Sequence, residues 1–96
     1  MKLTKESILA FLKAHKQEFQ EKYAVEKIGL FGSYAKNEAH ENSDIDILVK
    51  MPSSFDAYYD FKEYLEASFD RKVDLGLEKS IRGFVANEIQ KDIIYV

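Results

Sequence analysis

The stretch that decides the fold runs from residue 25 to residue 49 and reads VEKIGLFGSYAKNEAHENSDIDILV. Residues 25–31 alternate loosely between apolar and polar types, which predicts a strand. Gly32-Ser33 then interrupts this pattern, and residues 33–37 have room for one helical turn. We therefore expect a strand that ends in a tight turn into a short helix.

A second strand follows after a polar loop. Residues 37–43 carry mostly polar side chains and predict the loop, whereas residues 44–51 are mostly apolar. Pro52 ends this strand, because proline cannot donate a hydrogen bond to a sheet ladder. The two strands of the stretch are thus separated by residues 32–43, which hold the turn, the short helix and the polar loop.

The second strand opens with two aspartates, Asp44 and Asp46, that are two residues apart. Successive side chains of a strand point to opposite faces, so both carboxylates share one face of the sheet. Two like charges held this close raise each other's pKa unless a cation lies between them. Carboxylate oxygens are the ligands that Mg²⁺ and Mn²⁺ prefer, so the pair is a candidate metal site.

A third carboxylate, Asp74, lies within an otherwise apolar strand predicted over residues 71–77. Its burial would be costly without a partner, and either Lys72 or Arg71 could pair with it. If its strand lies beside the Asp46 strand, three carboxylates converge, enough for a two-metal site that catalyses displacement at phosphorus.

The Gly32-Ser33 turn supplies the other half of this candidate site. A glycine at the end of a strand lets the backbone approach a ligand closely. A serine that opens a short helix offers its hydroxyl and free backbone N–H groups to a phosphate. One half of the site would then hold phosphate oxygens, and the carboxylates would hold the metal ions that bridge them.

The rest of the chain predicts helices around these strands. A helix is expected over residues 4–22, capped by Thr4 or Ser7, and a second one from Ser53 or Ser54 to Phe69. The apolar stripe of this second helix consists of Phe55, Tyr58, Phe61, Leu65 and Phe69. A last helix over 80–91 and a strand over 92–96 complete the order. This order indicates an α+β fold, a small mixed sheet of about four strands with helices on one face.

Composition limits the class of protein and its partners. The 96 residues suffice for one domain, 1–96, and the absence of cysteine excludes a disulfide framework and a thiolate zinc site. The net charge is −3 without a basic block, so long nucleic acid is a poor candidate for the main substrate. No apolar run is long enough to span a membrane and no signal peptide is evident, so we expect a cytoplasmic protein.

The residues from Gly32 to Asp46, followed by Ile-Leu-Val49, resemble the signature of the polymerase-β-like nucleotidyltransferase superfamily. More closely, the chain resembles the minimal nucleotidyltransferases, stand-alone domains of similar length called MNT proteins. The resemblance covers nearly the whole chain and includes Val73-Asp74-Leu75 and the closing 92–95 segment.

This resemblance implies transfer of AMP from ATP to a hydroxyl group, with release of pyrophosphate. It also implies an antitoxin that forms a hetero-oligomer with a HEPN-domain ribonuclease toxin and adenylylates one of its tyrosines. By the motif match, Asp44, Asp46 and Asp74 would be the catalytic and metal-binding residues, with Mg²⁺ or Mn²⁺. Gly32, Ser33 and Lys36 would bind the triphosphate.

The sequence departs from the family pattern at one place, where Lys36-Asn37 replaces the usual Arg-Gly pair. Lysine keeps the positive charge but cannot form the bidentate hydrogen bonds that arginine makes to phosphate. Two alternatives therefore stay open beside the enzyme: an antitoxin that neutralises its partner by binding alone, and a transferase for small molecules of the aminoglycoside type.

Overall fold

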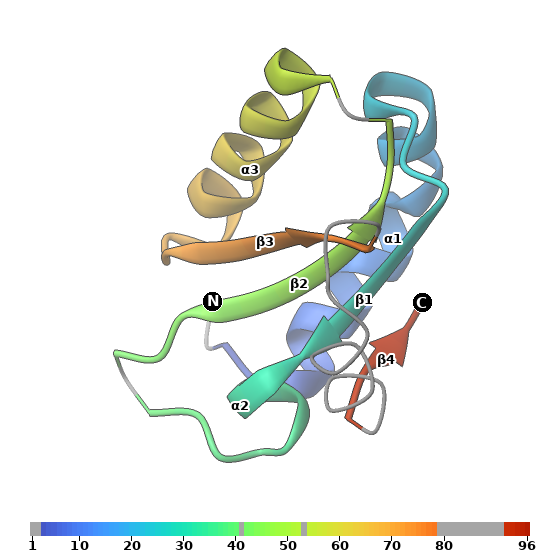
Figure 1. Cartoon of the computed structure of the whole chain (residues 1–96). Coiled ribbons are helices and arrows are strands. Elements are labelled where there is room, and N and C mark those ends of the chain that lie inside the picture. Colours follow the sequence, from blue (N-terminus) through green and yellow to red (C-terminus); the bar gives the residue numbers. More distant parts are fainter. Residues whose placement is uncertain (1–2, 41, 53, 79–91) are drawn as a thin grey trace.

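The structure is a computed structural model that describes residues 3–40, 42–52, 54–78 and 92–96. The described residues form three helices and four strands, and Figure 1 shows how they are arranged. The elements are α1 (Lys5–Tyr23), β1 (Lys27–Phe31), α2 (Gly32–Ala35), β2 (Ile45–Lys50), α3 (Phe55–Phe69), β3 (Val73–Leu77) and β4 (Ile94–Tyr95). The last predicted helix, 80–91, lies outside the described residues.

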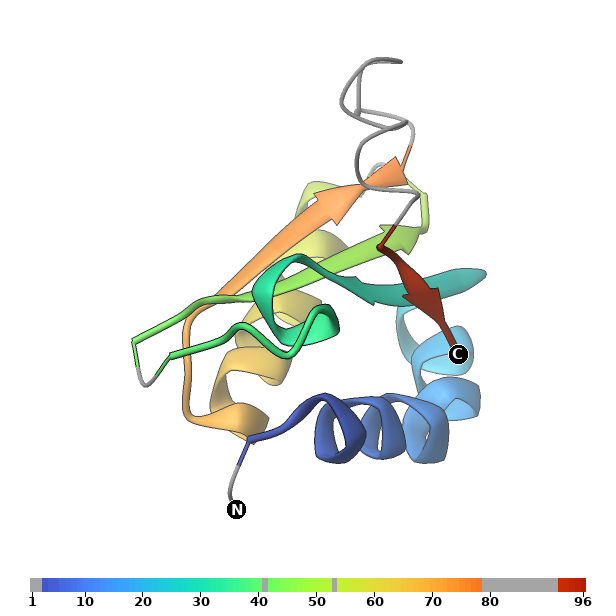
Figure 2. The same cartoon turned by 90° about the horizontal axis from the view of Figure 1, so that it is seen from below.

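The strands form one mixed sheet in the order β3-β2-β1-β4. β1 pairs with β2 and with β4 in antiparallel fashion, whereas β2 and β3 are parallel. Figure 2 shows that α1 and α3 lie on the same side of this sheet. The expected α+β architecture, with four strands and helices packed on one face, is confirmed.

Both long helices begin at residues whose side chains cap them. Thr4 accepts a hydrogen bond from the backbone N–H of Ser7, and the Ser7 hydroxyl accepts one from the N–H of Thr4. The two predicted caps of α1 therefore act together as a capping box. Ser54 caps α3 by accepting a hydrogen bond from the N–H of Ala57.

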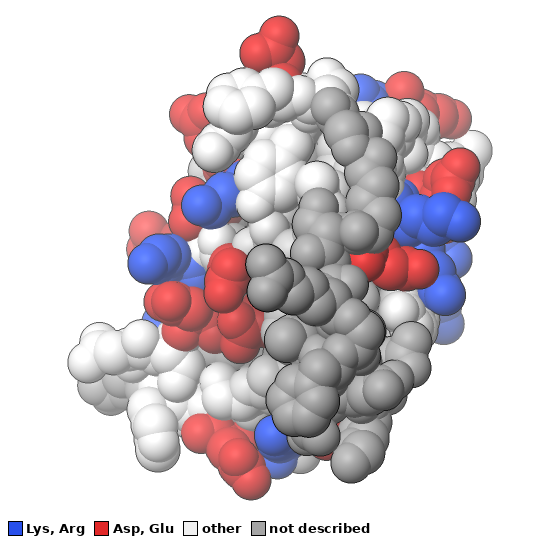
Figure 3. Space-filling model, viewed as in Figure 1, with Lys and Arg blue, Asp and Glu red and all other residues white. Residues whose placement is uncertain are grey.

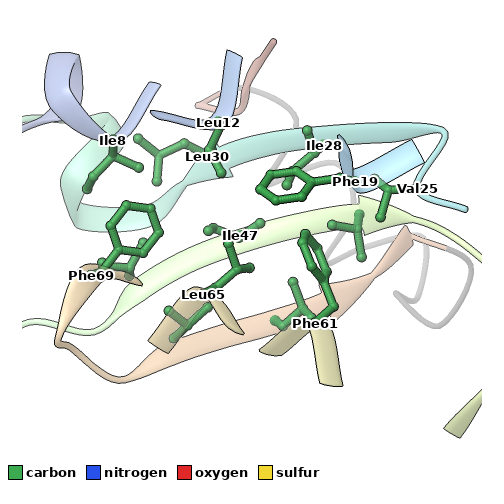
Figure 4. Close-up of a cluster of buried hydrophobic side chains, with 14 of the residues drawn as sticks. Ile8, Leu12, Phe19, Val25, Ile28, Leu30, Ile47, Phe61, Leu65 and Phe69 are labelled. Carbon is green, nitrogen blue, oxygen red and sulfur yellow. The ribbon is translucent and has the colours of Figure 1, made fainter. Parts of the chain in front are cut away.

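The hydrophobic core lies between the sheet and the two long helices (Figure 4). Its fully buried members include Ile8, Leu12, Phe19, Ile28, Leu30, Ile47, Phe61 and Leu65. Burial of each such side chain stabilises the fold by about 1.5–3 kcal/mol, so this layer fixes the position of β1 and β2. Among the described residues, no helix has the length and apolar character that crossing a membrane requires.

The observed strands are shorter than expected by one or two residues at their ends, and one side chain is more exposed than expected. β2 begins at Ile45, so Asp44 lies one residue before the strand. Phe55 heads the predicted apolar stripe of α3, but its side chain is 74% exposed. Helical periodicity gives the side of a helix that faces the core but not how far the core extends, and the first turn of α3 lies beyond it.

Candidate functional site

The turn between β1 and α2 brings the backbone against the second strand. Phe31 is the last residue of β1, and its partner across the antiparallel ladder is Asp46. Gly32 follows with φ +74°, a left-handed conformation that side chains other than glycine rarely adopt. A β-carbon at Gly32 would overlap Oδ2 of Asp46. Glycine is therefore required here both by the backbone conformation and by the neighbouring carboxylate.

Asp46 and Asp74 lie side by side on neighbouring parallel strands, because the register of β2 and β3 pairs them. Asp44 lies one residue before β2, and its charge acts on the carboxyl of Asp46. Ile45 and Ile47 point the other way and are fully buried under the helices. Asp46 and Asp74 thus lie next to each other on the face opposite α1 and α3, and the predicted site of three carboxylates stays a prediction.

The carboxylates of Asp44, Asp46 and Asp74 repel one another when all three are ionised. Burial raises the pKa of Asp46, and the charges of Asp74 and Asp44 raise it further, from 3.8 to about 6. In Figure 3, acidic side chains gather over β2 and β3. Carboxylates with strongly shifted pKa values are concentrated at functional sites, where they bind a cation or exchange a proton.

Two lysines lie at the margins of the site. Nζ of Lys72 is 3.9 Å from Oδ2 of Asp44, and Nζ of Lys36 is 3.3 Å from Oδ2 of Asp92. All four side chains are well exposed, so each pair contributes little to stability. Lys36 is thus held toward the C-terminal segment, and its predicted contact with phosphate stays a prediction.

A family model described as a nucleotidyltransferase domain matches residues 12–96. The chain belongs to this nucleotidyltransferase family. It is 41% identical over 97 residues to a Thermococcus cleftensis protein named protein adenylyltransferase MntA, with 98% of this chain and 97% of that one covered. It is 44% identical over 98 residues to MJ1379 of Methanocaldococcus jannaschii, provisionally named a protein adenylyltransferase, with 97% and 98% covered.

Solved structures share the nucleotidyltransferase fold. A chain provisionally named a minimal nucleotidyltransferase superposes with a TM-score of 0.80 at 23% identity, over 96% of this chain and 95% of that one. A toxin–antitoxin structure with AMP-PNP gives a TM-score of 0.69 at 26% identity, over 97% of this chain and 72% of that one.

The carboxylates of this nucleotidyltransferase fit a divalent metal by their chemistry. They present oxygen ligands on one face, and a dication would relieve the repulsion that raises the pKa of Asp46. Among the described residues, no three His, Cys, Asp or Glu side chains are already close enough to form a metal centre. A metal centre built from Asp44, Asp46 and Asp74 would therefore require these side chains to turn toward one another.

Asn37 occupies the position where the family pattern has glycine, and its φ is +59°. Asparagine tolerates this left-handed conformation better than most residues, so the replacement of glycine preserves the path of the loop after α2.

Two features of this nucleotidyltransferase site did not emerge from the sequence. The contact between Gly32 and Asp46 depends on the antiparallel register of β1 and β2, and no local pattern encodes that register. The sequence suggests Lys72 as a partner for Asp74, but the ammonium group of Lys72 lies near Asp44 instead. The parallel pairing of Ile45 with Val73 explains this, because it sets the residues preceding each of them side by side.

Proposed function

We propose that this chain transfers AMP from ATP to a hydroxyl group of a partner protein, a tyrosine of a HEPN-domain ribonuclease, and acts as its antitoxin. One observation carries the proposal: Asp46 and Asp74 lie side by side next to the Gly32 turn, in a chain that matches a protein adenylyltransferase over nearly the full length of both. The similarity to a toxin–antitoxin structure with AMP-PNP supports both the partner and the nucleotide. A cytoplasmic setting, where ATP is available, fits this activity.

The chemistry is a displacement at the α-phosphorus of ATP. The acceptor oxygen forms a bond to that phosphorus, the bond to the bridging oxygen breaks, and pyrophosphate leaves. Asp74 would accept the proton of the acceptor hydroxyl, and its exposed position beside Asp46 supports this role. Gly32 and Ser33 open α2, whose first amides have no acceptor within the helix and suit phosphate oxygens.

Asp44, Asp46 and Asp74 would hold the metal, Mg²⁺ or Mn²⁺. When bound, such an ion neutralises phosphate charge and orients the attacking and leaving oxygens. The carboxylates themselves provide its binding site and, at Asp74, a base.

The test uses purified chain, a purified HEPN-domain partner, Mg²⁺ and ATP labelled on the α-phosphate. We expect label on the partner with wild-type chain and a loss of at least about 100-fold with Asp46→Asn, since electrostatic groups of this kind contribute that much to rate. Glu63→Gln, a change at an exposed carboxylate on α3, should leave the rate unchanged. Equal labelling by wild type and Asp46→Asn would refute the assignment.

Neutralisation by binding alone is a second candidate, favoured by the engagement of Lys36 with Asp92. It expects the variant with both Asp44→Asn and Asp46→Asn to protect cells from the partner ribonuclease as well as wild type does. The enzyme hypothesis expects that protection to be lost while the variant remains folded.

A further inference from the structure

A cluster of apolar side chains lies exposed at the start of α3. Phe55 and Tyr59 are 74% and 49% exposed, and their ring centroids are 4.7 Å apart. With Ser54, Tyr58 and Leu77 they line a cavity of about 290 Å³. We call these five residues the α3 patch. Single exposed apolar residues are common, but a group of aromatic rings in contact around a cavity indicates a binding surface.

The α3 patch adjoins the strand that carries Asp74. β3 is an edge strand of the sheet, and Leu77 is its last residue. The Tyr58 hydroxyl donates a hydrogen bond to the backbone carbonyl of Leu75, the residue after Asp74. The patch therefore lies on the helix side of β3, and the carboxylates lie on its other side.

The surface itself shows the same arrangement. In Figure 3, a region of mostly uncharged side chains lies on the α3 side of the molecule, and the acidic side chains over β2 and β3 lie below it. Burial raises the pKa of Tyr58, and the nearby charges of Tyr59 and Asp74 raise it further. The influence of Asp74 on Tyr58 agrees with the short path between patch and site.

We propose that the α3 patch is the docking surface for the acceptor protein, which inserts an apolar side chain between Phe55 and Leu77 while its hydroxyl reaches Asp74. This inference rests on the proposed function. A folded protein that brings a hydroxyl to bonding distance of the α-phosphorus must also cover the surface around Asp74. The α3 patch is the apolar part of that surface on the β3 side.

The edge of β3 argues for packing of side chains rather than addition of a strand. An added strand would need the outward backbone groups of β3 as hydrogen-bond partners. Tyr58 already occupies the carbonyl of Leu75. An acceptor that lies here is therefore held by apolar contact, and this part of its affinity should depend little on salt.

The test measures binding and transfer separately, with a purified HEPN-domain protein as acceptor. In calorimetric titration without ATP, the variant with Phe55→Ser and Tyr59→Ser should bind the acceptor about tenfold or more weakly, as is usual for central aromatic contacts. In the labelling reaction its KM for the acceptor should rise by the same factor, with KM for ATP unchanged.

Matched variants guard against simple damage to the fold. Phe55→Leu with Tyr59→Phe keeps the apolar surface and should restore binding. Tyr95→Ser removes an exposed aromatic side chain from β4, at the opposite edge of the sheet from β3, and should have no effect on acceptor binding.

Three outcomes would overturn the inference. The serine variant could bind the acceptor as tightly as wild type, or Tyr95→Ser could weaken binding equally. Sedimentation could also show that the patch joins two copies of this chain, with acceptor binding unaffected by the serine changes. Failure of the proposed function is distinct from these results, because the acceptor would then bind wild type at the patch but receive no label.

Discussion

Gly32 has no β-carbon, and this allows two things at once. Its backbone can adopt the left-handed conformation, and the carboxylate of Asp46 can lie against it. Gly32→Ala should cost about 1–2 kcal/mol of stability, because alanine resists the left-handed conformation. It should also displace Asp46, and displacement by about 1 Å can reduce a rate about 100-fold. Urea unfolding and labelling of the acceptor measure the two effects.

Asn37→Ala is the matched control for this change, since Asn37 is also left-handed but follows the end of α2, whereas Gly32 opens it. It should lose stability of similar size and retain activity within a few-fold. If Asn37→Ala lost as much activity as Gly32→Ala, backbone strain alone would explain both variants.

The carboxyl of Asp46 opposes folding where it is ionised. Its pKa is about 6 in the folded protein against 3.8 ordinarily, so between these values the folded state binds more protons than the unfolded state. Stability should therefore fall as pH rises from about 4 to about 6 in metal-free buffer. The full shift corresponds to about 3 kcal/mol, and the partial exposure of the group reduces the expected effect to about 1–2 kcal/mol.

Asp46→Asn should consequently stabilise the metal-free protein at pH 7 and flatten the fall between pH 4 and pH 6. Denaturant unfolding at both pH values measures this, with Glu63→Gln as the exposed control. A variant that is no more stable than wild type at pH 7 would show that the raised pKa does not reflect repulsion at the site.

At the scale of elements, α1 ends in Ala24, which has φ +56°. Glycine is preferred at such left-handed helix ends because it has no β-carbon. Ala24→Gly should therefore raise stability by about 0.5–1 kcal/mol and the Tm by several degrees. Ala14→Gly, in the exposed interior of α1, should instead lower stability by about 1 kcal/mol. Thermal unfolding of the pair checks this, and two changes of the same sign would contradict it.

The elements were largely predictable because their signals are local. The Thr4 and Ser7 capping box, the Pro52 stop and the alternation around Asp46 all act within a few residues. The exposure of Phe55 was not predictable, because it depends on where the sheet ends beneath α3. The Gly32 contact with Asp46 was missed for a similar reason, since it needs the register of two strands.

At the scale of the whole molecule, one face of the sheet is buried under α1 and α3, and the other gathers charge that a ligand must compensate. Mg²⁺ with AMP-PNP should therefore stabilise the whole domain, by about 2.7 kcal/mol at 100 times the dissociation constant. For a domain of this size that corresponds to a rise in Tm of about 10 °C or more. Asp46→Asn should begin with a higher Tm than wild type in EDTA and gain much less from the ligands, because it has lost both the repulsion and a metal ligand. Differential scanning calorimetry of both proteins, with and without EDTA, measures the crossing of the two values. An equal gain in both proteins would place the metal and the nucleotide away from Asp46.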